Sequence, residues 1–114
     1  MILVIGSHFQ GKKAYVKEKF KLKESDFSDD LYSPSEVLYD FQNLKNDFTD
    51  EEIEILLNKK AVISLETGCQ VMALNEETRL HAEKVNSVLQ LLAQNAEAVV
   101  RVYCGIPTAL KGEI

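Results

Sequence analysis

The residues that decide the fold are MILVIGSHFQGKKAYVKEKF (1–20). Residues 2–5 form a continuous apolar run rich in β-branched side chains, which is typical of a strand covered on both faces in a parallel sheet. Residues 12–20 are mostly good helix formers, with apolar side chains at helical spacing among lysines. A loop bounded by Gly6 and Gly11 joins the two segments. The stretch therefore predicts a strand, a glycine-bounded loop and a helix in succession.

The next segment is harder to interpret. Residues 21–33 are polar and acidic, and we expect an irregular connection there. The sequence SPSE (33–36) has the form of a helix start, with apolar residues at helical spacing that extend the predicted helix to Phe48. The alternative is a short strand over residues 37–39, followed by a helix from Asp40.

The remainder alternates helices and strands. The expected elements are a helix opened by the capping box at Thr49 and ending near Asn58, a strand over 61–65, a helix over 75–94 and a strand over 98–104 that ends at Gly105-Ile106-Pro107. Strands that alternate with helices of this length predict a parallel sheet with helices on its faces. We expect an α/β fold in a single domain, residues 1–114.

The composition of the chain narrows the classes of function that we expect for it. The chain has 114 residues, 46% of them hydrophobic and 27% charged, which indicates a folded domain. Its net charge of -5 argues against a dedicated nucleic-acid binder. Cys69 and Cys104 have no metal-ligand spacing, so we expect no metal site, no disulfide and a reducing cytoplasm. No apolar run approaches the length needed to cross a bilayer, and we expect no membrane association.

The loop is the strongest candidate site. Residues GSHFQGK (6–12) match the first seven positions of the phosphate-binding motif G-x-x-x-x-G-K-[ST], in which loop amides cradle phosphate oxygens and the lysine reaches the β- and γ-phosphates. We expect Lys12 to be catalytic as well as binding. The predicted nucleotide-binding residues are Gly6, Ser7, His8, Phe9, Gln10, Gly11, Lys12 and Lys13.

One position departs from the motif, and two carboxylates are candidate partners of the loop. Lys13 replaces the metal-binding hydroxyl residue, so it either supplies charge where Mg²⁺ would sit or faces solvent. Glu66, directly after the strand over 61–65, is predicted to hold Mg²⁺ or to orient an attacking hydroxyl. Asp40 would take the Mg²⁺ role only if residues 37–39 form a strand, whereas on a helix it is a surface residue.

The final third carries further motifs. Residues 79–86 read RLHAEKVN, in which Arg79, Val85 and Asn86 match three positions of a known family's pattern R-D-x-x-G-R-V-N, and GIPTALK (105–111) matches that family's ending G-[IL]-P-x-x-[LI]-K. Together with the loop and with Glu66, these residues resemble the adenosylcobinamide kinase/adenosylcobinamide-phosphate guanylyltransferase family of cobalamin biosynthesis. The resemblance covers residues 1–20 and 61–112.

That resemblance implies a three-layer, P-loop NTPase-like kinase fold. Family members phosphorylate the aminopropanol hydroxyl of adenosylcobinamide, a corrinoid, with GTP or ATP and Mg²⁺, transfer GMP through a histidine and form homotrimers. By resemblance, residues 6–12 would bind the nucleotide phosphates, and Glu66 would take the acidic position after its strand.

This sequence departs from the family's motifs at several positions. The departures include Lys13 for Ser or Thr, Leu65 for Asn, Glu83 for Gly and Lys84 for Arg. Residues 21–60 are shortened and contain no histidine, so we do not expect guanylyl transfer. Two other readings remain: a non-catalytic relative that acts as an interaction or regulatory protein, and a small-molecule kinase with another acceptor.

Overall fold

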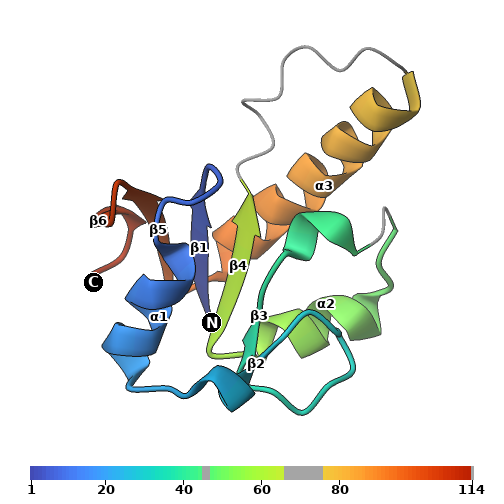
Figure 1. The fold of residues 1–114 in the computed structure, drawn as a ribbon. Helices are drawn as coiled ribbons and strands as arrows, with labels where there is room; N and C mark the ends of the chain where they lie inside the picture. Colours follow the sequence, from blue (N-terminus) through green and yellow to red (C-terminus); the bar gives the residue numbers. More distant parts are fainter. Residues whose placement is uncertain (45–46, 66–75, 114) are drawn as a thin grey trace.

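The chain folds into one six-stranded sheet with helices on both faces (Figure 1). The computed structural model describes residues 1–44, 47–65 and 76–113. The strands are β1 (Ile2–Gly6), β2 (Phe27–Ser28), β3 (Val37–Leu38), β4 (Ala61–Leu65), β5 (Ala98–Tyr103) and β6 (Ile106–Lys111). The helices are α1 (Lys12–Phe20), α2 (Asp50–Leu57) and α3 (Glu76–Asn95), with short 3₁₀ turns η1 (Glu24–Asp26) and η2 (Phe41–Asn43).

The strand order confirms the predicted α/β class. The order is β2-β3-β4-β1-β5-β6, and every pair of neighbours is parallel except β5 and β6. Strand β1 lies between β4 and β5, where Ile2 stands beside both Ala61 and Ala98. A central parallel strand is covered on both faces, which is why the apolar run at the start of the sequence is continuous.

Two hydrophobic cores lie on opposite faces of this sheet. On one face α1 packs through its buried Val16 against Val4 and Val100. On the other face the core unites α2 and α3, through residues such as Leu56 and Leu92, with alternate residues of the same strands. Because successive strand residues point to opposite faces, neighbouring residues of β1 serve different cores. The result is three layers, helix, sheet and helices.

The helix α2 begins as its capping box predicts. The Thr49 hydroxyl accepts a hydrogen bond from Glu52 N at 3.2 Å, and the Glu52 carboxylate accepts one from Thr49 N at 3.0 Å. This reciprocal pair satisfies amides that have no partner within the helix. The predicted cap of α3, Asn75, falls outside the described residues.

The prediction of a helix over Pro34–Phe48 is wrong. Val37–Leu38 forms β3, which pairs with β2 on one side and β4 on the other. Residues 21–33, expected to be irregular, contain η1 and β2. The expectation failed because local spacing favoured a helix, whereas pairing with distant strands decided the outcome.

Contacts from the end of α2 hold the chain that leads into β3. The Lys59 ammonium donates hydrogen bonds to the carbonyls of Ser33 and Ser35, both at 2.8 Å. The Lys60 amide donates to the carbonyl of Glu36 at 2.8 Å. Burial of Lys59 lowers its pKa, so this ammonium is held by the two carbonyls at a cost in desolvation.

The C-terminal segment adds a strand that the sequence pattern does not predict. Gly105-Ile106-Pro107 does not end the strand region, because residues 106–111 return as β6, antiparallel to β5. Cys104 and Gly105 form the connecting turn with φ values of 51° and 76°. Two-residue hairpins favour positive φ at both central positions. Pro107 is tolerated because β6 is an edge strand.

The topology creates a switch point beside β1. The connection from β1 to β2 runs through α1 on one face, whereas β4 is followed by α3 on the other face (Figure 1). Neighbouring strands whose chains leave toward opposite faces open a crevice at their carboxyl ends, where ligands of open α/β sheets bind. The loop after β1 stands at this place.

Candidate phosphate-binding site

The loop between β1 and α1 is framed by two glycines, each with a structural reason. A Cβ atom on Gly6 would lie 2.6 Å from the carbonyl oxygen of Val102 in β5, closer than atoms can approach. Gly11 precedes α1 with a φ of 90°, in the left-handed region that favours glycine. The loop therefore packs tightly against β5 and turns sharply into the helix.

Lys12 is the first residue of α1, and its side chain turns back into the loop. The ammonium donates hydrogen bonds to the carbonyl of Ser7 at 2.6 Å and to that of Gly6 at 3.2 Å. The first amides of α1 add partial positive charge at the same end of the helix. The loop thus gathers an ammonium and a helix N-terminus, the elements that a phosphate group requires.

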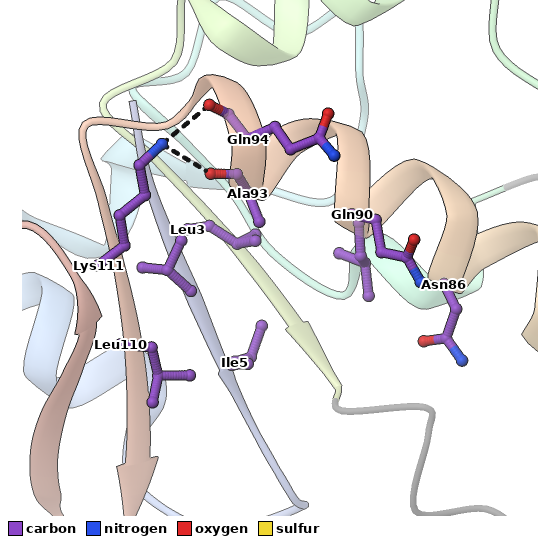
Figure 2. A pocket seen from close by; sticks show the side chains of 10 residues that line it. Leu3, Ile5, Asn86, Gln90, Ala93, Gln94, Leu110 and Lys111 are labelled. Atoms are coloured by element: carbon purple, nitrogen blue, oxygen red, sulfur yellow. Dashed lines mark hydrogen bonds between the residues drawn. The ribbon is translucent and has the colours of Figure 1, made fainter.

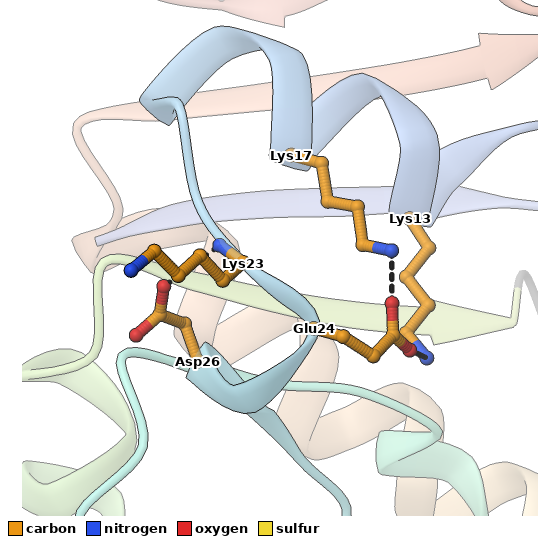
Figure 3. Close-up of polar contacts among 5 residues, drawn as sticks. All are labelled: Lys13, Lys17, Lys23, Glu24 and Asp26. Atoms are coloured by element: carbon orange, nitrogen blue, oxygen red, sulfur yellow. Dashed lines mark hydrogen bonds and ion pairs between the residues drawn. The ribbon is translucent and has the colours of Figure 1, made fainter.

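The Lys13 side chain extends toward Glu24 in η1 (Figure 3). Its ammonium lies 3.0 Å from a carboxylate oxygen of Glu24 and 4.2 Å from the centre of the Tyr39 ring. Lys17 pairs with the same carboxylate. Hydrogen bonds from Lys17 and Lys13 lower the pKa of Glu24. Lys13 therefore takes part in an ion pair, which neither of the two expectations for it describes.

The tip of the loop is exposed. Phe9 is fully accessible to solvent and has a φ of 58°, which is unusual for a residue with a bulky side chain. The rings of His8 and Phe9 lie 6.0 Å apart. Ser7 is exposed as well. These residues lie at the mouth of the site.

A cavity of about 490 Å³ lies beside the loop. Loop residues 8–13 form one wall, Tyr39 and Asp40 contribute from the chain directly after β3, and Ile63 contributes from the middle of β4. Because residues 37–38 form a strand, Asp40 stands at the carboxyl edge of the sheet, with a left-handed φ of 52°. The strand expected over 37–39 as the condition for the Mg²⁺ role of Asp40 is thus present at 37–38, and the role itself stays a prediction.

The second predicted carboxylate, Glu66, falls outside the described residues, which end at Leu65 in this part of the chain. The Leu65 amide donates a hydrogen bond at 2.9 Å to the side-chain oxygen of the buried Gln42. The Gln42 carbonyl lies 2.7 Å from Nε2 of His81 on α3. Sequence reasoning missed Gln42, since nothing in its local pattern distinguishes it from a surface glutamine.

A larger cavity, of about 600 Å³, lies on the opposite face, between α3 and β6 (Figure 2). Its walls are mainly apolar, with Leu3, Ile5 and Leu110 among them. Lys111 donates hydrogen bonds to the carbonyls of Ala93 and Gln94 at 3.0 and 2.8 Å, so β6 is tied to the end of α3. The cavity between α3 and β6 shares no lining residue with the loop cavity.

Comparison with known proteins adds no identification: no protein-family model matches this chain, and no curated protein matches it at a significant level. Among residues 1–44, 47–65 and 76–113, no helix has both the length and the apolar character needed to cross a bilayer. The same residues hold no group of three His, Cys, Asp or Glu side chains placed to bind a metal ion. The geometry of the loop is therefore the main indication of function.

Proposed function

We propose that residues 6–12 bind the phosphates of GTP or ATP, and that this chain is a P-loop kinase related to adenosylcobinamide kinase. One observation carries the proposal: the Lys12 ammonium is turned into a glycine-bounded loop between a central strand and a helix N-terminus. The loop also stands at the switch point of the sheet, where α/β proteins bind ligands.

The chemistry of the loop favours an anion. The Lys12 ammonium now rests on two neutral carbonyls of the loop itself. A phosphate oxygen carries a full charge and forms stronger hydrogen bonds with an ammonium than a carbonyl does. An arriving phosphate would therefore form stronger hydrogen bonds with Lys12 than these two carbonyls do.

The cavity beside the loop supplies room for an acceptor. In the proposed reaction the acceptor oxygen bonds to the γ-phosphorus while the bond from that phosphorus to the β–γ bridging oxygen breaks. Asp40, on the far wall of the cavity, or Glu66 would orient the acceptor hydroxyl and take its proton, or hold Mg²⁺ through carboxylate oxygens. The acceptor suggested by the family resemblance is the corrinoid hydroxyl.

A second candidate function rests on Lys13. The motif has a metal-binding hydroxyl at this position, and here the side chain forms an ion pair with Glu24. A protein that binds nucleotide without transferring phosphate would retain Lys12 and need no such hydroxyl. This chain would then act as a nucleotide-dependent interaction protein.

A transfer assay separates these candidates. Purified protein is incubated with adenosylcobinamide, Mg²⁺ and GTP or ATP labelled at the γ-phosphate, beside Lys12→Ala and a matched Lys19→Ala variant on the same helix. Label on the corrinoid with the parent and Lys19→Ala, but not with Lys12→Ala, supports the kinase. Nucleotide binding without transfer supports the second candidate. If the protein shows no nucleotide binding and no transfer, the proposal is overturned.

A further inference from the structure

The loop is fastened to the β5–β6 turn through one residue, Gln10. Its main-chain carbonyl accepts a hydrogen bond from Gly105 N at 2.8 Å, and its side-chain oxygen accepts one from Cys104 N at 2.6 Å. The side-chain nitrogen donates to the carbonyl of His8 at 3.3 Å. Gln10 thus joins the loop to a turn 94 positions further along the chain.

The turn is shaped to accept this residue. Cys104 and Gly105 both have positive φ, and their consecutive amides bind two oxygens of the same glutamine. Consecutive main-chain N–H groups of this kind form concave binding sites for electron-rich atoms. A Cβ atom on Gly11 would lie 3.4 Å from the Cα atom of Gly105, so the two main chains run close together.

The geometry of the peptide bond relates the Gln10 carbonyl, held at the turn, to the amide of Gly11 in the loop. In a planar trans peptide the carbonyl of one residue and the amide of the next point in opposite directions. Since the Gln10 carbonyl is held at the turn, the amide of Gly11 points away from it. That amide directly precedes α1 and belongs to the loop proposed to bind phosphate.

We propose that Gln10 is a positioning residue: it fixes the direction of the Gly11 amide for an anion in the loop, and it couples that anion to the β5–β6 turn. The inference rests on the proposed phosphate-binding function, and it gives Gln10 a role other than direct contact with the ligand. It also connects the β5–β6 turn, which does not line the loop cavity, to the proposed site.

The first test is binding of inorganic tripolyphosphate, which has no nucleoside. Gln10→Met removes both side-chain hydrogen-bonding groups at similar size, and Gln90→Met, at an exposed position of α3 that lines the other cavity and not the loop cavity, is the matched control. We expect Gln10→Met to bind about tenfold more weakly, equivalent to about 1.4 kcal/mol. The control should bind as the parent does. The main-chain bond from Gly105 remains in this variant, so unchanged affinity in Gln10→Met would overturn the positioning role of the Gln10 side chain.

The second test uses the exposed thiol of Cys104 as a reporter. In a Cys69→Ser background Cys104 is the sole cysteine, and its alkylation by iodoacetamide is followed over time. We expect tripolyphosphate to change the alkylation rate in this background and to leave it unchanged when Gln10→Met is added. An equal effect of the anion with and without Gln10→Met would contradict the coupling.

A conservative variant separates positioning from stability. Gln10→Glu keeps a side-chain oxygen for Cys104 N, so without the anion its alkylation rate should not exceed that of the Cys69→Ser parent, because the added charge disfavours the thiolate, and that of Gln10→Met should be higher. Equal rates in all three would show that Gln10 does not fasten the loop. If the parent binds neither tripolyphosphate nor nucleotide, the proposed function fails, and this comparison without anion still decides whether the fastening exists.

Discussion

Two neighbouring lysines at the start of α1 serve different parts of the molecule. Lys12 places its ammonium on the carbonyls of Ser7 and Gly6, inside the loop. Lys13 places its ammonium on Glu24 and over the Tyr39 ring, where it ties α1 to η1 and to the chain after β3. Figure 3 shows the contact of Lys13 with Glu24.

The difference follows from helix geometry. Successive residues of an α-helix point about 100° apart, because 3.6 residues complete a turn. The Lys12 ammonium therefore lies on the loop carbonyls while the Lys13 ammonium reaches Glu24, although both residues line the loop cavity. The phosphate-binding motif assigns both positions to one site, whereas the two ammonium groups have different partners. Removing each lysine separately tests this difference.

The largest effect is expected when the two lysines are removed separately. Lys12→Ala should weaken binding of tripolyphosphate or nucleotide by about a hundredfold, equivalent to about 2.7 kcal/mol, because the loop loses its charge. Lys13→Ala should retain most of the affinity. Calorimetric titration measures both variants, and similar losses in both would remove the distinction between them.

The frame that holds Lys12 is tested at Gly6. Gly6→Ala should lower the free energy of unfolding by about 1–3 kcal/mol, because its Cβ would overlap a main-chain carbonyl of β5. Gly105→Ala is the control: no atom lies within 4 Å of its added Cβ, and only its positive φ of 76° opposes the change. Denaturant unfolding should rank Gly6→Ala as the more destabilised, and the reverse order would contradict the tight packing.

The carboxylate opposite the loop is tested at Asp40. We expect Asp40→Asn to weaken the Mg²⁺-dependent part of nucleotide binding by about threefold to tenfold, as the loss of one charged ligand would. Binding without Mg²⁺ should stay the same or improve, because a negative charge near the phosphates is removed. Asp29→Asn, exposed and outside the loop cavity, is the control. Equal Mg²⁺ dependence in parent and Asp40→Asn would exclude this role.

The smallest effect concerns the ion pairs of Glu24. Lys17 and Lys13 lower its pKa, so the carboxylate stabilises the folded chain above the usual carboxylate range, and this contribution is lost as the pH falls through the lowered value. Glu24→Gln should therefore unfold slightly more easily at pH 7, and the difference from the parent should vanish in acid and shrink in high salt. A difference that grows as the pH falls would have the wrong sign.

The N-terminal unit could be predicted from the sequence because its signals are local. The buried strand, the loop glycines and the helix each follow from neighbouring residues, and the expected helix over 12–20 coincides with α1. The capping box at Thr49 succeeds for the same reason. Here propensity, patterning and tertiary packing agree.

The parts that could not be predicted depend on distant partners. Strand β3 has only two residues and is held by its neighbours in the sheet and by contacts from Lys59 and Lys60. The pairing of Gln10 with the Cys104–Gly105 turn spans nearly the whole chain. No spacing rule within a short window reports such contacts, so both the role of the hairpin and the position of Asp40 required the fold.

The most direct test of the central claim is calorimetric titration of the parent protein with GTP and with ATP, each with and without Mg²⁺. The account predicts binding in the micromolar range, about -8 kcal/mol, that is lost in Lys12→Ala. Absence of binding up to millimolar nucleotide, or equal binding by Lys12→Ala, would contradict the assignment of this loop as a phosphate-binding site.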